Sequence, residues 1–163
     1  MTTALMLLLG VVLTAGTFIF VSAEFSLVAV DQAVLDKKAE EGDRGAASVL
    51  RATRTLSTQL SGAQVGITLT TILLGYTTQS ALADLLEDLL GSVGLAWGLA
   101  TGIAAFVAAA FVNVFSMLFG ELVPKNLALA HPLATAVRVV PLQVAFTAFA
   151  RPVIWVPGGT ASW

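Results

Sequence analysis

One carboxylate in this chain stands in surroundings that could bind a metal ion. Glu121 follows Gly120 and precedes the residues Leu-Val-Pro-Lys, at the end of a long apolar segment. Pro124 has no amide hydrogen and its ring clashes with the carbonyl four residues earlier, so the Gly120 carbonyl loses its helical partner. A carboxylate beside a freed carbonyl offers hard oxygen donors, which suit Mg²⁺ or Na⁺. We therefore expect Glu121 and Gly120 to be cation ligands.

Polar side chains also interrupt the other apolar segments of the chain. They are Ser22, Glu24 and Ser26 in the first segment, Gln59, Ser61 and Gln64 in the second, and Asn113 and Ser116 in the third. If the three segments cross a membrane in alternating directions, all of these groups fall in the same half of the bilayer. Asn113 and Met117, four residues apart, share the helix face that leads to Glu121. One shared polar cavity is the economical explanation.

Each of these features also has a purely structural interpretation. Glu121 and Lys125 stand at i and i+4, where they can form a simple salt bridge. Glu24 can cap the following segment or pair with Lys125, and the serine and amide side chains can bond within or between helices. His131 fits the membrane interface, and the tryptophans read as interfacial anchors: Trp97, Trp155 and Trp163. Two carboxylates inside a membrane are harder to explain structurally.

The composition identifies the elements that must position these residues as membrane helices. Of 163 residues, 57% are hydrophobic and 11% are charged, and the mean hydropathy is +0.91. Because soluble domains carry about 25% charged residues, the sequence excludes a soluble fold and a basic nucleic-acid-binding surface. Zero cysteines and a single histidine exclude thiolate and multi-histidine metal sites within one chain. We expect an all-α membrane protein and no enzyme, since no nucleophile–base motif is recognisable.

The positions of the charges predict three transmembrane helices, at about 4–30, 56–76 and 95–119. Each segment supplies the roughly 20 apolar residues that a bilayer requires. No basic residue precedes Lys37, so the first segment is a span rather than a signal peptide. Only 12 uncharged residues separate Arg138 from Arg151, and prolines punctuate the region. We therefore expect residues 132–157 to form a re-entrant or interfacial hairpin, with a tilted fourth span as the alternative.

The connecting segments predict the orientation of the chain in an inner membrane. The segment 31–55 carries five basic residues, whereas 77–94 carries three acidic residues and no basic one. The rule that basic loops stay inside places 31–55 in the cytoplasm, 77–94 outside, the amino terminus outside and the carboxyl terminus inside. Apolar residues recur at helical spacing on both sides of Gly42, which predicts two short amphipathic helices within 31–55.

Four sequence motifs occur in the order typical of one known family. They are FVSAEFSL at 20–27, AEEG at 39–42, LSGAQVGITL at 60–69 and FGELVPK at 119–125. Together they closely resemble the transmembrane domain of the CNNM/CorC family, once labelled hemolysin-like. The resemblance covers nearly the whole chain, so we expect residues 1–163 to form one domain of this type. It implies three transmembrane helices, a membrane-embedded hairpin after the kink, a homodimer, and export of Mg²⁺ coupled to Na⁺ entry.

The resemblance also implies regulatory parts that this chain lacks. Full-length members continue into a cytosolic pair of nucleotide-binding CBS domains, so ATP would act only through those domains. We therefore expect an isolated membrane domain or a truncated form.

The chain departs from the family pattern at two positions. Relatives that transport have a serine three residues before the acidic or amide position of the first span, where this chain has Val21 beside Ser22. They also carry Gly-Asn-Thr where this chain reads Gly-Ile-Thr, and Ile67 cannot replace the Asn ligand. The cation site is then either weakened or rebuilt.

The sequence thus gives a candidate site and two hypotheses. Glu121 is the principal ligand, Gly66 and Gly120 offer carbonyls, Pro124 is a hinge, and Glu24 and Lys125 set the local charge. The side chains that would line the site are Ser22, Ser26, Gln64 and Asn113. The first hypothesis is a dimeric transporter of Mg²⁺ that works by alternating access. The second is a non-transporting membrane anchor and dimerisation module that acts through a missing cytosolic region.

Overall fold

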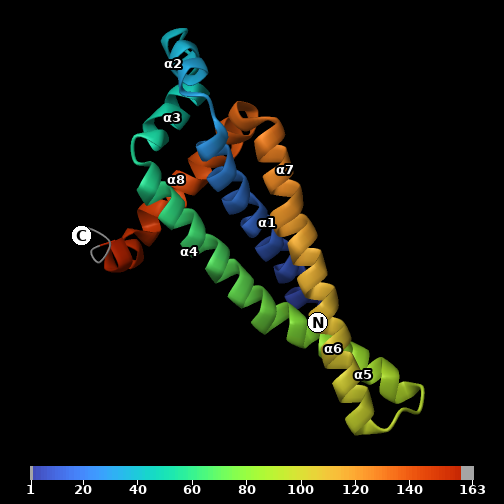
Figure 1. Ribbon diagram of the computed structural model, residues 1–163. Coiled ribbons are helices and arrows are strands. Elements are labelled where there is room, and N and C mark those ends of the chain that lie inside the picture. Colours follow the sequence, from blue (N-terminus) through green and yellow to red (C-terminus); the bar gives the residue numbers. More distant parts are fainter. Residues whose placement is uncertain (1, 159–163) are drawn as a thin grey trace.

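The computed structural model describes residues 2–158, with side chains described for 3–152, and within this range every regular element is helical. The first helix, α1 (Thr2–Ala29), lies centrally (Figure 1). On its two sides run α4 (Leu56–Leu74) and the helix that contains α6 (Trp97–Ser116). The expected all-α class is confirmed.

Two short helices, α2 (Gln32–Glu40) and α3 (Arg44–Thr53), occupy the segment 31–55, as predicted. Each has an aspartate N-cap: Asp31 accepts from the amides of Ala33 and Val34, and Asp43 does the same for α3. Such caps satisfy amide hydrogens that have no partner at a helix start. Between the helices the chain turns at Gly42, whose φ of +92° favours glycine. An apolar cluster then fixes the pair against α1 and α8: Leu27, Val30, Leu35, Ala46, Val49, Ala52, Ala136 and Val140.

The segment 77–94, expected to be an acidic loop, is largely helical. A π-helical stretch, η1 (Gly75–Gln79), joins α4 to α5 (Ser80–Ser92), so only residues 93–96 connect α5 to α6. The two helices form a hairpin at one end of the molecule (Figure 1). Three of the four buried residues of α6 are alanines, Ala100, Ala104 and Ala108, which permits close helix packing; the fourth is Val112. Leucines between the acidic residues of α5 give it a helical pattern that the charges obscured.

The third predicted span is longer than expected. After α6 the chain continues through a second π-helical stretch, η2 (Met117–Leu122), into α7 (Val123–Ala130), and Trp97–Ala130 is continuous. Pro124 therefore does not end the helix. It falls in the first turn of α7, a position where a missing amide hydrogen is tolerated, and the preceding turn widens.

The prediction of a hairpin within 132–157 is wrong in position. The chain reverses at His131, and residues Pro132–Gly158 form one helix, α8. Its segment Pro132–Pro152 is one of three described helices long and apolar enough to cross a membrane, with Thr3–Ala29 and Trp97–Ala130. The 12 uncharged residues between Arg138 and Arg151 underestimated the length of the apolar helix. Long arginine side chains can extend away from such a helix, so an arginine need not end it. Pro141 is exposed, so its ring does not have to fit between helices.

The second predicted span, 56–76, does form a helix of bilayer length. With 19 residues, α4 is about 28 Å long at 1.5 Å per residue. It is not one of the three helices named above as apolar enough to cross a membrane, because serine, threonine and glutamine side chains recur along it. This polar helix packs against both α1 and α8.

Candidate cation site

Two glycines bring α4 and η2 into close contact with α1. A methyl group added to Gly66 would lie 2.6 Å from the Phe20 ring, and one added to Gly120 would lie 3.3 Å from Thr17. Thr17 also shares a 2.7 Å hydroxyl–hydroxyl hydrogen bond with Thr70 of α4. Three segments far apart in the sequence therefore meet around the middle of α1.

The two predicted serines of α1 are completely buried. Ser22 and Ser26 are both 0% exposed. The Ser26 hydroxyl donates to the carbonyl of Ala23 at 3.3 Å, whereas the Ser22 Oγ has no hydrogen-bond partner. Leaving a buried hydroxyl unpaired costs about 1–3 kcal/mol. Val21, where the resemblance led us to expect a serine, is buried and apolar.

The backbone around Glu121 is wound as a π-helix. The amide of Val123 donates to the carbonyl of Leu118, five residues earlier. The next residue, Pro124, has no hydrogen to donate to Gly120. Short π-helical segments are frequent at functional sites because they alter the local hydrogen-bonding pattern. Gly66, the other predicted carbonyl ligand, already accepts a 2.9 Å hydrogen bond from the Thr70 hydroxyl.

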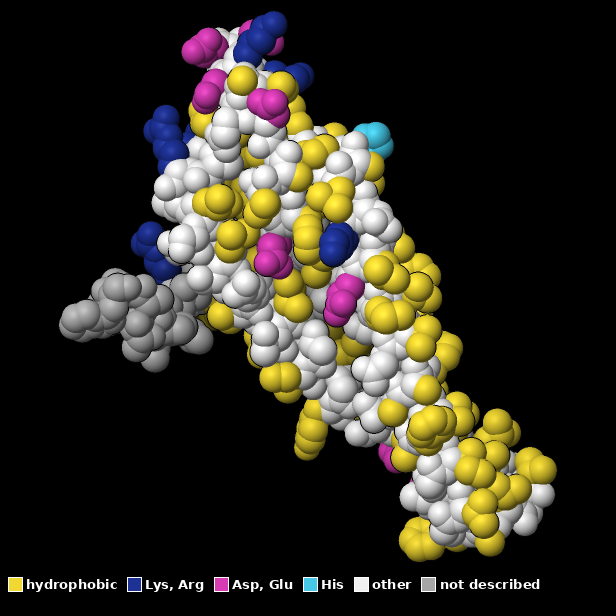
Figure 2. All heavy atoms as spheres, in the orientation of Figure 1, with side chains coloured by type: hydrophobic (Ala, Val, Ile, Leu, Met, Phe, Trp, Pro, Cys, Tyr) yellow, Lys and Arg dark blue, Asp and Glu magenta, His cyan; other side chains and the backbone are white. Residues whose placement is uncertain are grey.

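The predicted charged residues lie on the outer side of this contact. Glu121 and Lys125 are exposed and Glu24 is half-buried. The Lys125 ammonium lies 4.9 Å from the centre of the Phe25 ring, a cation–π contact between α7 and α1. Acidic and basic side chains are visible among hydrophobic ones over the middle of these helices (Figure 2). The described residues contain no group of three or more acidic or histidine side chains that could hold a metal ion.

The two predicted amide side chains do not join the buried contact. Gln64 is exposed on α4, and Asn113 is exposed on α6, where its Nδ2 donates to the carbonyl of Ala109 at 2.8 Å. Ile67 is half-buried. Trp97 and His131 are exposed as expected of interfacial residues, while the side chain of Trp155 and the whole of Trp163 lie outside the described residues.

A buried polar cluster between α4 and α8 was not predicted from the sequence. Gln143 is 0% exposed, and its Nε2 donates to the backbone carbonyl of Gln59 and to the Thr147 hydroxyl, both at 3.0 Å. The Oε1 atoms of Gln143 and Gln59 are buried without partners. A signal was present, because Gln143 and Thr147 stand four residues apart within an apolar stretch and so share a helix face.

Fold and site together define a helical membrane protein with oxygen donors buried at a helix junction. A family model described as "Cyclin M transmembrane N-terminal domain" matches residues 8–163, and the chain belongs to this CNNM family. The family is associated with divalent cation transport.

Several bacterial proteins are similar to this chain. It is 44% identical to "UPF0053 protein MT1890" of Mycobacterium tuberculosis, over 93% of this chain and 33% of that protein. It is 32% identical to "UPF0053 protein YhdP" of Bacillus subtilis, over 95% of this chain and 35% of that protein. The chain thus spans about a third of the length of these relatives.

Proposed function

We propose that this membrane domain transports Mg²⁺, by alternating access in a homodimer and in exchange for Na⁺. The observation that carries the proposal is the Ser22 hydroxyl, which is buried without a partner on the helix that Gly66 and Gly120 both approach. Because an orphaned buried oxygen is costly, a cation that accepts its lone pair explains why the chain retains it. The family's association with divalent cations supports the same reading.

The ligand set in this proposal is sparse and consists of oxygen atoms. Glu121 supplies the negative charge. The neutral oxygen ligands are the carbonyls of Gly120 and Gly66 and the hydroxyls of Ser22 and Ser26. Mg²⁺ dehydrates reluctantly and usually keeps several waters, so few protein oxygens suffice. Gln64 and Asn113, exposed on the single chain, line the path between the site and the aqueous phase.

The π-helical turn before Pro124 is the moving part of the proposed transporter. Its widened backbone can change its hydrogen bonding at little cost, since Pro124 cannot lock the Gly120 carbonyl into an α-helical bond. Lys125, held over Phe25, and Glu24 set the charge at the end of this turn. In this proposal the basic segment 31–55 faces the cytoplasm, following the positive-inside rule.

The test is Mg²⁺ flux into proteoliposomes, followed with a trapped fluorescent Mg²⁺ indicator. Glu121→Gln keeps the size of the side chain and removes its charge, and we expect it to abolish flux. Asp88→Asn is the matched control, because Asp88 is an exposed acid on α5, away from the α1 junction. If Glu121→Gln transports like the parent, Glu121 is not a cation ligand.

A second candidate function is a membrane anchor that dimerises without transporting. It is favoured by Val21 and Ile67, which are apolar where the family resemblance implies a serine and a ligand asparagine. It is also favoured by the Thr70 hydrogen bond that already occupies the Gly66 carbonyl. Calorimetry with millimolar MgCl₂ and NaCl distinguishes the two candidates. Heat of binding that Glu121→Gln removes supports transport, whereas an absence of any response supports the anchor.

A further inference from the structure

A cleft of about 530 Å³ opens at the end of the molecule that carries α2 and α3. It lies between the turn that joins those two helices and the turn that joins α7 to α8. Its lining residues are Lys38, Asp43, His131, Pro132, Leu133, Ala134, Val137 and Arg138. This cleft is separate from the junction of α1, α4 and η2 described above.

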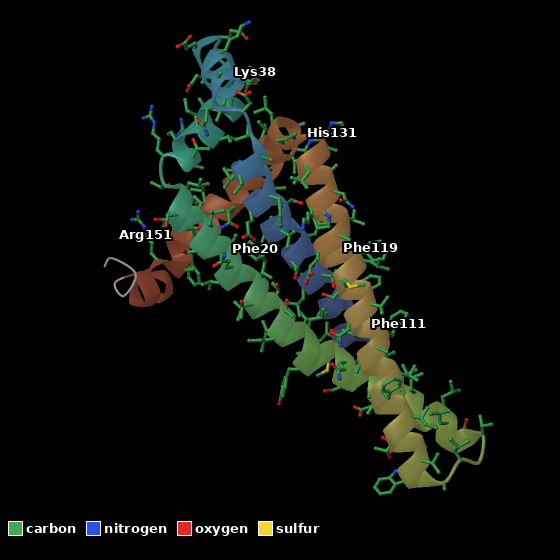
Figure 3. All side chains as sticks on the ribbon, viewed as in Figure 1. Phe20, Lys38, Phe111, Phe119, His131 and Arg151 are labelled. Atoms are coloured by element: carbon green, nitrogen blue, oxygen red, sulfur yellow. The ribbon has the colours of Figure 1, made fainter. Side chains whose placement is uncertain are left out.

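Two cationic side chains and an imidazole, from three separate segments, line the cleft. Lys38 comes from α2, His131 from the α7–α8 turn and Arg138 from α8, and all three side chains are exposed and available to a ligand. Lys38 and His131 lie at the same end of the molecule (Figure 3). The one acidic side chain of the lining, Asp43, is already engaged as the N-cap of α3. Its Oδ1 accepts from the amides of Gly45 at 2.8 Å and Ala46 at 3.0 Å.

The start of α8 adds to this positive character. The cleft is lined by Pro132, Leu133 and Ala134, the first residues of a helix that continues to Gly158. Pro132 has no amide hydrogen, but the amides of Leu133 and Ala134 lack intrahelical acceptors at the helix start and carry a partial positive charge. Together with the guanidinium of Arg138, which can bind two phosphate oxygens at once, this arrangement suits a phosphate group.

The remaining lining is apolar and continues into the long helix. Leu133 and Val137 line the cleft one turn apart on α8, whose segment Pro132–Pro152 is apolar enough to cross a membrane. A ligand with a phosphate at one end and a hydrocarbon chain at the other fits both parts of this surface. The cleft also lies where the charged α2–α3 pair meets the apolar helices, as a headgroup site requires if those helices span a membrane.

We propose that this cleft binds the phosphate of an anionic phospholipid headgroup, with Lys38 and Arg138 as the principal cationic contacts. The bound headgroup joins the α2–α3 pair to the start of α8. The proposal does not depend on cation transport, because no residue of the cleft belongs to the Glu121 site.

The test measures binding of phosphatidylglycerol to the purified chain in neutral detergent, by native mass spectrometry and by thermal shift. We expect the lipid to bind and raise the melting temperature, and phosphatidylcholine to do so far less. Each basic residue near an anionic lipid surface contributes about 1 kcal/mol, so Lys38→Gln or Arg138→Gln should weaken binding about fivefold. Arg138→Lys, which keeps the charge, should bind more tightly than Arg138→Gln.

Arg151→Gln is the matched control, because Arg151 is an exposed arginine at the far end of the same helix (Figure 3). Unchanged binding by this variant supports the proposal, and a loss equal to that of Arg138→Gln overturns it. Equal melting temperatures of the lipid-free variants and parent show that the cleft folds normally. If inorganic phosphate binds as tightly as the lipid, the ligand is a soluble anion and the lipid assignment fails.

Discussion

Replacing Gly66 by alanine tests the central contact between α1 and α4. The added methyl carbon would lie 2.6, 2.7 and 2.8 Å from three carbons of the Phe20 ring, closer than real side-chain carbons approach one another. The ring cannot turn freely, because it also packs against Phe146 of α8 with ring centres 4.6 Å apart. The substitution must therefore both overpack the contact between the two helices and displace the Phe20 ring from Phe146.

The expected magnitude follows from three contributions. Overpacking a close helix contact costs about 1–3 kcal/mol, and losing the aromatic pair costs about 0.5–1.5 kcal/mol. Alanine returns about 0.8–1.0 kcal/mol through its better helix propensity. The net loss is then about 2 kcal/mol, which for a chain of this size lowers the melting temperature by about 4–8 °C.

The assay is thermal unfolding of the purified chain in detergent, followed by circular dichroism at one fixed heating rate. Gly102→Ala is the matched control, since Gly102 lies in α6 with open space where a methyl group would go. We expect this control to melt at or slightly above the temperature of the parent. Adding Phe20→Leu to Gly66→Ala should recover part of the loss, because the smaller side chain makes room. If Gly66→Ala melts like Gly102→Ala, or if the two substitutions are simply additive, the contact is not as tight as described.

Two further substitutions test the polar contacts of the fold. Gln143→Ala should destabilise the chain by about 2–3 kcal/mol, because it removes buried hydrogen bonds and leaves a cavity. In the same melting assay Gln143→Met should lose less stability, and Gln64→Ala, at an exposed position, should lose almost none. Asp43→Ala removes the N-cap of α3 and should cost about 1 kcal/mol, seen as faster amide hydrogen exchange in α3. Asp43→Asn retains the cap, so exchange as fast as in Asp43→Ala would contradict the capping role.

Much of the secondary structure could be predicted because it depends on neighbouring residues. The apolar segment 4–30 is long enough to make α1, and Gly42 between two amphipathic stretches separates α2 from α3. The predictions failed where charged residues or prolines were taken to end a helix. The acidic residues of α5 were read as a loop, and the prolines and arginines of α8 were read as breaks in a helix that is continuous.

The candidate site was only partly predictable, because a local motif does not show which side chains a helix buries. The FGELVPK motif identified Gly120 and Pro124 as unusual backbone positions, and the structure places them in and beside a π-helical turn. It could not indicate that Gln64 and Asn113 are exposed, because that depends on how each helix is rotated about its axis.

The sequence by itself determined a helical membrane protein with its polar groups concentrated at a few positions. Composition and periodicity are enough for this, because a bilayer requires long apolar helices with internally bonded backbones. Only the tertiary structure decided which polar groups are buried together. Gln143 meets Gln59 across 84 residues, and Gly66 meets Phe20 on another helix. Such contacts depend on the rotation and tilt of whole helices, which are set by the fit of many side chains at once and leave no local pattern in the sequence.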